Sequence, residues 1–357
     1  MERRDAVLEG LTKDQRGIEI GPWFNPLASK AEGYQCLVLD VFDLATLRQR
    51  ATEIANVADN IRDRIEDVDL LGSSANIEEL VAARGELGEF DYIVSSHNFE
   101  HLPNPIKFLQ GCAKALKPGG IISMAIPDKR SCFDYFRPLT SLGQWIDAYE
   151  AQRDKPTRAQ YFDLYSCLAA FDTGNGASIA FHRGVPPDKV SSSLSLDRYY
   201  AEWQEQSRSG SEQYLDTHCS VFTPASFELL IRDLGYLGLA PFEIVRVFDS
   251  PGVEFYARLK RSDSPSSLRP PDYEDTRNTL LRRILDESSE ASNTRLEATE
   301  LRNQNTRLKD ELSALHREIE ALKREAALRD HELSAVRTST SWRITSPLRR
   351  AVTILRK

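Results

Sequence analysis

The stretch Gly17-Ile-Glu-Ile-Gly-Pro-Trp-Phe-Asn-Pro-Leu27 contains a short apolar strand followed by a sharp turn. Two isoleucines flank Glu19, and Gly21 begins a turn that glycine tolerates more easily than other residues. A second apolar run, 36–40, ends in Asp40. Parallel sheets bind ligands at the carboxyl ends of their strands, where a carboxylate can accept hydrogen bonds from ribose hydroxyls. The two runs therefore predict a ligand site at one edge of a sheet.

The rest of the first 260 residues extends this pattern. Short apolar runs alternate with helical patterns from residue 17 to about 126, which predicts an α/β fold with a parallel sheet and helices on its faces. The expected strands are 18–21, 36–40, 66–70, 90–95 and 121–126, and the expected helices are 44–61, 76–84 and 105–116. Another helix, 223–235, has Thr223 as its N-cap and Gly235 at its end. Two further strands, 242–248 and 253–260, are separated by a turn and predict a hairpin.

Two longer motifs carry a resemblance to a known family. The stretch Phe90-Asp-Tyr-Ile-Val-Ser-Ser-His-Asn-Phe-Glu-His-Leu-Pro-Asn-Pro105 and the later Leu116-Lys-Pro-Gly-Gly120 are similar to motifs of class I S-adenosylmethionine-dependent methyltransferases. The first turn resembles the cofactor turn of that family, although only Gly21 of the usual glycines is present. The resemblance covers 17–127 and, more loosely, 223–260. It implies a Rossmann-like methyltransferase sheet that ends in an antiparallel strand.

The resemblance also implies roles for individual residues, with S-adenosylmethionine as the cofactor. Glu19 and the Gly21 backbone would meet its methionine part, together with Asn25 in the same turn. Asp40 would meet the ribose. The remaining expected contacts are Asp69 to the adenine, at the end of the third strand, and Ser95, Ser96 and His97 along the sulfonium side.

Methyl transfer to a hydroxyl needs alignment and a base that removes the proton. His182 and His218 are the candidate catalytic residues, since both lie among aromatic and polar residues. A hydrogen-bonded structural role is the alternative for each. His97-x-x-Glu100-His101 has the spacing of a metal cluster, but no further ligand is apparent, and we expect orienting residues and no metal.

Composition limits the other functions. The net charge of −8 argues against nucleic-acid binding. Five scattered cysteines without a Cys-x-x-Cys pair indicate reduced thiols in a cytoplasmic protein. No apolar run is long enough to cross a bilayer, so we expect a soluble protein or one bound to the inner face of the membrane.

The expected domain organisation follows from these patterns. Residues 1–127 and 223–260 form the methyltransferase core, and 128–222 form an aromatic-rich insertion after the fifth strand. We expect this insertion to be a helical lid that supplies part of a substrate pocket. A polar linker, 261–290, precedes a coiled coil, 291–337, and a basic amphipathic tail, 338–357.

The coiled coil rests on heptads. With a at 298, 305, 312, 319, 326 and 333, four successive d positions are Leu, at 301, 308, 315 and 322. A single Asn305 at a favours a parallel homodimer. Three g-to-e′ pairs can attract across such a dimer: Glu297–Arg302, Glu318–Lys323 and, when His316 is protonated, Glu311–His316. Glu325–Asp330 repels. The alternative is a single solvated helix.

The tail combines five basic residues with apolar ones and has no acid from 341 to 357. This suits a membrane surface, a frayed end or a docking peptide for a protein partner. It also resembles short segments of bacterial polysaccharide-assembly enzymes. We therefore expect an enzyme that methylates a sugar hydroxyl of a polysaccharide or glycolipid. The alternatives are a small-molecule acceptor and a non-catalytic scaffold.

Overall fold

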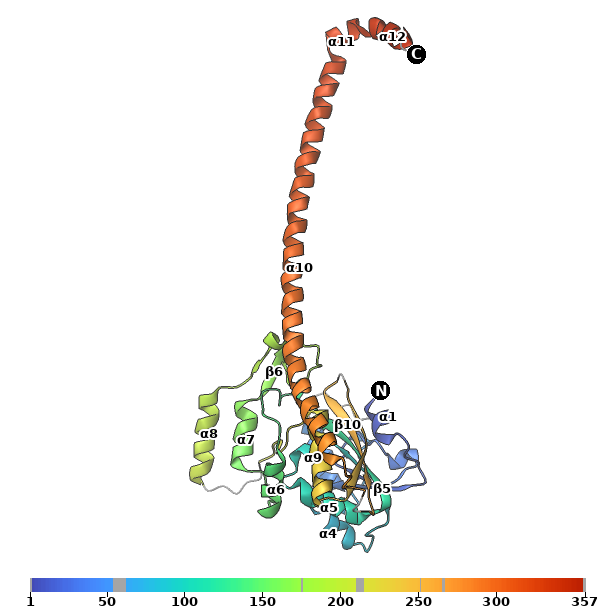
Figure 1. Ribbon diagram of the computed structural model, residues 1–357, viewed down its shortest axis with the longest axis vertical. Coiled ribbons are helices and arrows are strands. Elements are labelled where there is room, and N and C mark those ends of the chain that lie inside the picture. The colour runs from blue at the N-terminus through green and yellow to red at the C-terminus, as the bar shows by residue number, and fades with distance from the viewer. Residues whose placement is uncertain are drawn as a thin grey trace. The chain divides into compact units, whose positions relative to one another are not determined.

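The computed structural model of this 357-residue chain describes residues 2–53, 62–174, 176–209, 215–250, 252–264 and 267–355 (Figure 1). Its centre is a seven-stranded sheet with the order β3-β2-β1-β4-β5-β10-β9. Five strands are parallel: β1 (Arg16–Ile20), β2 (Gln35–Asp40), β3 (Leu70–Leu71), β4 (Phe90–Ser96) and β5 (Leu116–Pro127). The last strand, β10 (Glu254–Arg261), is antiparallel to both β5 and β9 (Phe242–Phe248), which confirms the predicted hairpin.

The third strand differs from its prediction of 66–70. It covers only Leu70–Leu71, because Asp69 bonds to β2 partly through its side chain. The N–H of Asp69 donates to the Val38 carbonyl, and its carboxylate accepts the N–H of Val38 at 2.8 Å. The N–H of Val38 therefore donates to the Asp69 side chain and is not available for the backbone hydrogen bond that a longer β3 would have needed.

Helices cover both faces of the sheet. On one face α4 (Ile77–Ala82), α5 (Pro105–Ala115) and α9 (Pro224–Leu237) supply apolar side chains to the main core, and on the other α1 (Arg3–Leu8) packs against Tyr92 and Val94. Helix α2 (Leu44–Glu53) matches the start of the expected 44–61, and the remaining positions, 54–61, lie outside the described residues.

Helix α9 runs past Gly235 to Leu237, and its C-cap is Gly238, which has a φ of 75°. The predicted end at Gly235 was therefore two residues too early. Gly238 adopts the left-handed conformation that glycine favours after a helix, whereas Gly235 is buried within the helix.

The insertion, 128–222, is not purely helical. It contains α6 (Leu142–Glu150), α7 (Arg158–Ser166), α8 (Leu196–Ser209) and an antiparallel sheet of β7 (Ala177–Ser178), β6 (Ala169–Asp172) and β8 (Val190–Ser192). Trp145 of α6 belongs to the main core, and its Nε1 donates to Ser220 at 2.9 Å. The prediction of a helical lid is corrected accordingly, because α6 is part of the core. Only Phe171 and Val190 of the three short strands are β-prone, so pairing between the segments and not local propensity forms this sheet. Short 3-10 helices complete the fold: η1 (Lys30–Glu32), η2 (Ser74–Asn76), η3 (Phe99–His101), η4 (Lys129–Ser131) and η5 (Pro187–Lys189).

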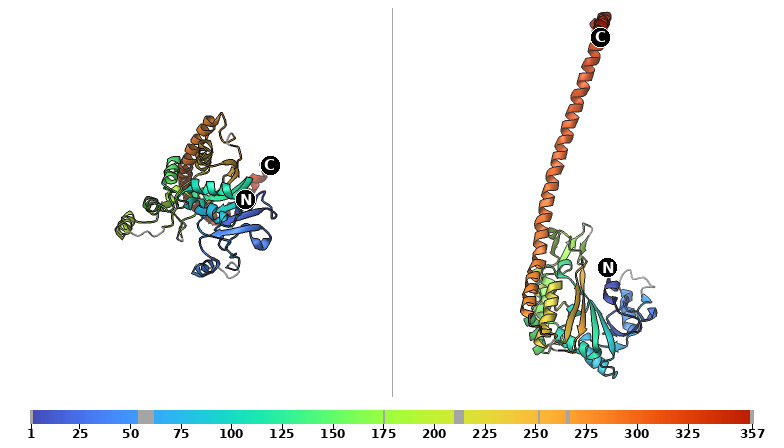
Figure 2. Two further views of the ribbon diagram at one scale, coloured as in Figure 1. Left: turned by 90° about the horizontal axis from the view of Figure 1, so that it is seen from below. Right: turned by 45° about the vertical axis from the view of Figure 1, so that its right-hand side comes forward.

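The expected linker, 261–290, is helical from Tyr273 onward, where α10 (Tyr273–Thr338) begins. The first turns of α10 lie beside α9 (Figure 2). Asp233 of α9 accepts hydrogen bonds from Tyr273 at 2.5 Å and from Arg277 at 3.0 Å. The predicted linker is therefore wrong from Tyr273 onward, because these buried contacts hold the segment against α9. Only the Pro/Ser-rich beginning of the segment had indicated a linker.

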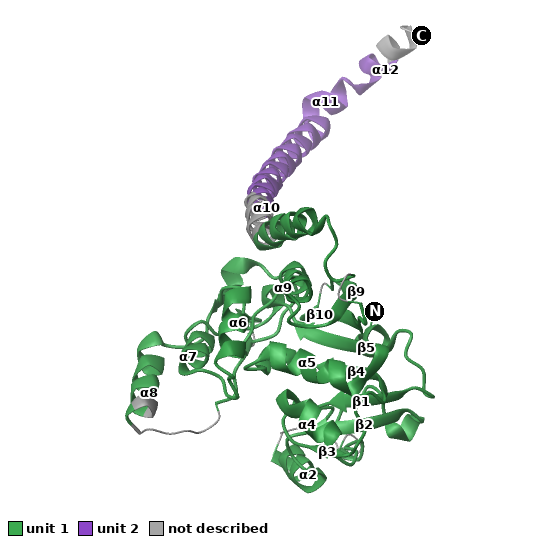
Figure 3. Ribbon diagram, turned by 60° about the horizontal axis from the view of Figure 1, so that its bottom comes forward, with its two compact units in different colours: residues 1–293 green, residues 294–357 purple. Residues whose placement is uncertain are grey.

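The chain divides into two compact units, 1–293 and 294–357 (Figure 3). The second unit holds the rest of α10, then α11 (Thr340–Ile344) and α12 (Ser346–Leu355). Among the described residues no helix is both long enough and apolar enough to cross a membrane.

Candidate functional site

A hollow of about 410 Å³ lies at the carboxyl ends of β1 and β4. This is the edge at which parallel sheets bind ligands, and the volume suits a small organic molecule. It is lined by Arg3, Glu19, Ile20, Gly21, Pro22, Trp23, Phe24, Asn25, Leu27, Ser96 and His97. Among the described residues, the insertion contributes nothing to this lining.

Glu19 and Gly21 shape the turn that forms one wall. The buried Glu19 carboxylate accepts the N–H groups of Leu27 at 2.8 Å and Ala28 at 2.9 Å, so it ties the turn to β1. Burial raises the pKa of Glu19 to about 7, although the two N–H groups oppose the shift. Gly21 has a φ of 60°, and a Cβ added there would meet no atom within 4 Å. The backbone is therefore open to the hollow at Gly21.

The two aspartates expected to bind the cofactor differ in their surroundings. Asp40 ends β2, is 8% exposed and accepts the N–H of Phe42 at 3.0 Å. Burial raises its pKa. Asp69 precedes β3 rather than ending it, and its carboxylate pairs with Lys30 at 2.5 Å as well as with the Val38 N–H. The prediction that Asp69 ends the third strand was therefore wrong, and its carboxylate already has two partners.

The three residues at the end of β4 lie together. Ser95 is wholly buried and accepts a hydrogen bond from Asn98 at 3.3 Å, whereas Ser96 and His97 line the hollow. His97 has a φ of 50°, which is uncommon for a residue other than glycine. Its Nε2 lies 2.6 Å from Glu254, which also accepts a hydrogen bond from Arg3 at 2.8 Å.

Charged neighbours set the protonation states of His97 and Glu254. Burial alone would lower the pKa of His97, but Glu100 and Glu254 outweigh it and raise that pKa to about 9. Burial would raise the pKa of Glu254, but His97 and Arg3 bring it down to about 2. The Arg3–Glu254–His97 contact is therefore an ionised network at neutral pH.

A second cluster lies directly behind His97. The Oε1 atom of Glu100 is 3.4 Å from Nδ1 of His97, 3.8 Å from Nε2 of His101 and 3.9 Å from Nε2 of His218. His218, one of the two expected bases, thus joins the predicted His97/Glu100/His101 group. The other, His182, is exposed on a loop, where its Nδ1 accepts the N–H of Gly184 at 3.1 Å.

Sequence reasoning missed several residues of this region. Arg3 and Glu254 meet His97 from opposite ends of the first unit, and Asp134 and Asp216 contact His218 and His101. The position of Glu254 at the start of the last strand, which pairs with the end of β5, was the one available signal. The contact of Arg3 depends on the packing of α1, and those of Asp134 and Asp216 depend on how the insertion folds.

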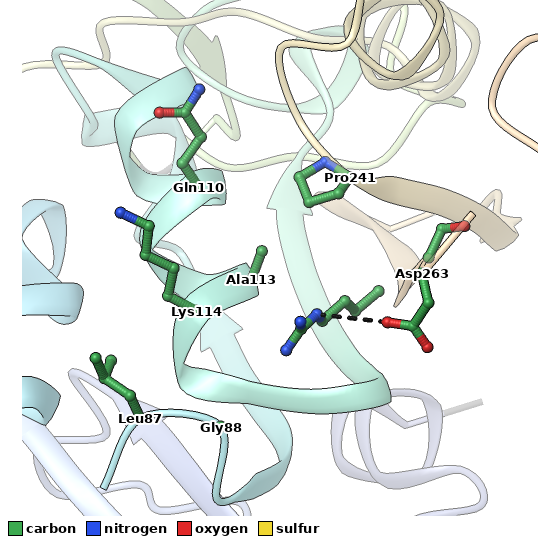
Figure 4. Close-up of a pocket in the computed structure, with 9 residues that line it drawn as sticks. Leu87, Gly88, Gln110, Ala113, Lys114, Pro241 and Asp263 are labelled. Atoms are coloured by element: carbon green, nitrogen blue, oxygen red, sulfur yellow. Dashed lines mark ion pairs between the residues drawn. The ribbon is translucent and has the colours of Figure 1, made fainter. Parts of the chain in front are cut away.

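A larger hollow, of about 680 Å³, lies elsewhere (Figure 4). Gly88 precedes β4 and Lys114 lies in the last turn of α5, so this hollow lies at the amino edge of the parallel strands. Its cations already have partners, since Lys114 pairs with Glu78 at 2.6 Å and Arg261 with Asp263 at 3.9 Å. The smaller hollow at the carboxyl edge is therefore the candidate cofactor site.

Known proteins resemble this chain at three levels. Residues 8–239 match the family model described as a methyltransferase domain. A ubiquinone biosynthesis O-methyltransferase from Caulobacter vibrioides is 31% identical over 120 residues, which are 34% of this chain and 42% of that protein. The chain therefore aligns with less than half the length of this curated relative.

Solved structures resemble the chain more weakly. An S-adenosylmethionine-dependent methyltransferase from Mesorhizobium loti is 12% identical with a TM-score of 0.36, covering 72% of this chain and 98% of its own. A protein described as a zinc-dependent alcohol dehydrogenase from Rhodobacter sphaeroides is 15% identical with a TM-score of 0.37, covering 72% and 88%. TM-scores this low do not establish a relationship.

The family match extends over more than half of the chain and includes every strand whose carboxyl end borders the hollow. The chain therefore belongs to the methyltransferase domain family.

Proposed function

We propose that the protein is an S-adenosylmethionine-dependent methyltransferase that binds its cofactor in the hollow at the ends of β1 and β4. The observation that carries this proposal is the position of the hollow, inside the matched methyltransferase domain and at the ligand-binding edge of the sheet. The open space beside Gly21 supports the fit, because a ligand could approach the backbone there.

The residues around the hollow suit the parts of this cofactor. The turn 21–27, held by Glu19, would bind its amino acid part. Asp40 does not line the hollow itself but ends β2, the strand beside β1, and would accept hydrogen bonds from the ribose hydroxyls. His97 and Ser96 would lie along the reacting side. When bound, the cofactor supplies an electrophilic methyl group on a sulfonium. The chain's own contribution is to align the acceptor and to take up its proton.

We propose His218 as the residue that takes up the proton of the acceptor. Of the two expected bases, His218 connects to the hollow through Glu100 and His97, whereas His182 does not join this network. The acceptor atom is a hydroxyl oxygen, as the O-methyltransferase similarity favours. We further propose a glycan or glycolipid acceptor, which is supported by the tail's resemblance to polysaccharide-assembly enzymes, with a small molecule as the alternative.

Calorimetry with S-adenosylmethionine tests the site directly. The wild type should bind, and Asp40→Ala should weaken binding by about tenfold or more because a ribose hydrogen bond is lost. Gly21→Asn places a side chain in the hollow and should abolish binding. Gly85→Asn is its matched control, since Gly85 has a similar φ of 69° and equally open surroundings but does not line the hollow.

No binding by the folded wild type at millimolar cofactor would refute the enzyme and favour the non-catalytic scaffold. An equal loss of S-adenosylmethionine binding in Gly21→Asn and Gly85→Asn would show that the substitutions disturb folding and do not act through the hollow. Methyl transfer to a panel of glycans and small hydroxyl compounds then identifies the acceptor class.

We also propose that two copies of the chain associate through the heptads. The leucines at a and d are exposed along α10; for example, Leu301 is 64% and Leu315 58% exposed. A parallel partner would cover this row.

The tail is proposed as a membrane contact, because α12 and the preceding α11 expose Trp342, Ile344 and Leu348 among basic residues. Sedimentation with anionic liposomes, lost on deletion of 338–357, tests the second proposal.

A further inference from the structure

We propose that Trp23 and Phe24 form an aromatic wall that binds the positively charged sulfonium of S-adenosylmethionine and so distinguishes this cofactor from its neutral, demethylated product. Both side chains line the hollow at the carboxyl ends of β1 and β4. Their ring centroids lie 4.8 Å apart, with an angle of 51° between the ring planes. This inference rests on the proposed function and gives a role to two residues to which the sequence assigned none.

The acidic side chains around the hollow are already engaged. Glu19 is the one acid among the described residues that line it, and both of its carboxylate oxygens accept backbone N–H groups of the turn. Glu254 lies beside this lining and is paired with Arg3 at 2.8 Å and with His97 at 2.6 Å. A cationic group of a ligand therefore meets no unpaired carboxylate among the described lining residues. The faces of aromatic rings attract cations, so the two rings can supply this attraction.

Trp23 connects the turn after β1 with the segment that follows Asp40. Its Nε1 donates to the carbonyl of Leu47 in α2 at 3.2 Å, and α2 is the helix that comes after β2 and Asp40. In the proposed function the turn binds the amino acid part of the cofactor, and Asp40 binds its ribose. The sulfonium joins these two parts, so a ring that bridges the two segments would lie next to its charge.

The protein holds this ring in place without a ligand. Trp23 has a φ of 44°, in the left-handed region that residues other than glycine rarely adopt. Its ring packs with Phe24 against a buried cluster of Leu47, Ala51 and Ile65. Residues in such strained conformations persist where the surrounding structure fixes them, often at ligand sites. A ring that is fixed beforehand loses little conformational entropy when a ligand binds.

The consequence of the aromatic wall concerns the product. Transfer of the methyl group to the acceptor oxygen leaves a neutral thioether, S-adenosylhomocysteine, while His218 takes up the acceptor proton in the proposed reaction. The attraction to the rings is lost together with the positive charge. One cation–π contact strengthens binding by about 3- to 30-fold, depending on how far it is shielded from water. The wall would therefore favour exchange of the product for fresh cofactor.

Calorimetry on the full-length protein tests this proposal through a ratio, the Kd of S-adenosylhomocysteine divided by the Kd of S-adenosylmethionine. Trp23→Leu should lower this ratio by about 3- to 30-fold, because leucine stays apolar but has no ring. Phe24→Leu should lower it in the same direction. Because both ligands are measured on the same sample, a partly unfolded variant still gives a meaningful ratio. An analogue in which an amine-bearing carbon replaces the sulfonium should lose affinity together with S-adenosylmethionine.

Two further variants separate the charge contact from packing. Trp23→Phe also loses the hydrogen bond to Leu47 but keeps an aromatic face, so it should retain most of the wild-type ratio. Phe42→Leu is the matched control, because Phe42 packs against the same cluster as Trp23 but does not line the hollow. Its ring lies 4.3 Å from the Arg50 guanidinium carbon. The ratio of Phe42→Leu should equal that of the wild type.

The outcomes separate this inference from the proposed function. An unchanged ratio in both Trp23→Leu and Phe24→Leu, with both ligands still bound by the wild type, would overturn the aromatic wall alone. So would a ratio in Trp23→Phe as low as that in Trp23→Leu, or an equal decrease in Phe42→Leu. Binding of neither ligand by the folded wild type would instead refute the proposed function, and the wall with it.

Discussion

Gly17→Ala should be among the most damaging small substitutions in this chain. Gly17 lies in β1 directly opposite Tyr92 of β4. A Cβ built on Gly17 would lie 2.0 Å from Cε2, 2.1 Å from Cζ and 2.6 Å from Cδ2 of the Tyr92 ring. Carbon atoms in contact are normally separated by about 3.5–4.0 Å. The ring or the strand would therefore have to move by about 1.5 Å or more.

The surroundings decide how much this movement costs. Tyr92 is completely buried in the core cluster that also contains Val94, Ala125 and Tyr256. Overpacking a tight core costs about 1–3 kcal/mol, and displacing a buried aromatic ring entirely would cost about 3–5 kcal/mol, as its removal does. We therefore expect Gly17→Ala to lower the free energy of unfolding by about 3–5 kcal/mol. Because β1 carries Glu19 and leads to Gly21, cofactor binding should weaken as well.

Urea unfolding followed by tryptophan fluorescence measures this effect. Tyr92→Val removes the obstructing ring, so in that background Gly17→Ala should cost less by about 2 kcal/mol or more. Gly143→Ala in α6 is the control, because its Cβ would approach no atom closer than 3.9 Å. Alanine should stabilise that helix position by up to about 1 kcal/mol. A cost below about 1 kcal/mol for Gly17→Ala, or an equal cost with Val at position 92, would refute the steric argument.

Three further predictions concern a buried acid, a helix contact and assembly. Burial raises the pKa of Glu19 from 4.5 to about 7, so ionisation of this side chain opposes folding. The free energy of unfolding should therefore fall by up to about 3 kcal/mol as the pH rises from 4.5 to about 7. Urea unfolding of Glu19→Gln should lack this slope, and parallel pH profiles would contradict the assignment. Asp233→Ala should cost about 2–3 kcal/mol, because the Tyr273 hydroxyl and the Arg277 guanidinium lose their acceptor. The exposed Asp275→Ala should cost less than about 0.5 kcal/mol in the same assay. Removal of residues 294–357 should convert a dimer to a monomer in light scattering and leave the first unit folded, whereas a full-length protein that is monomeric at about 50 μM would exclude pairing through the heptads.

The sequence determined the order of the core elements because their signals are local. Apolar runs of the right length, the N-cap Thr223 and the alternation of strands and helices predicted the order of six of the seven strands of the sheet, although β5 begins at Leu116 and not at the predicted residue 121. The turn at Gly21 was also readable, since a strand followed by Gly-Pro must change direction there. The hollow accordingly contains Glu19, Gly21, Asn25, Ser96 and His97, all of which were predicted.

Tertiary structure decided what sequence spacing cannot encode. Asp69 stands before its strand and not at its end, because its carboxylate bonds to the Val38 N–H and replaces a strand contact. The start of α10 is ordered through Asp233, although its composition resembles a linker. His218 meets Glu100 and His101 across more than a hundred residues, because two backbone N–H groups fix its segment to the Glu100 carbonyl. Local patterns arise from the backbone of one segment, whereas these contacts arise from the packing of several segments on the sheet.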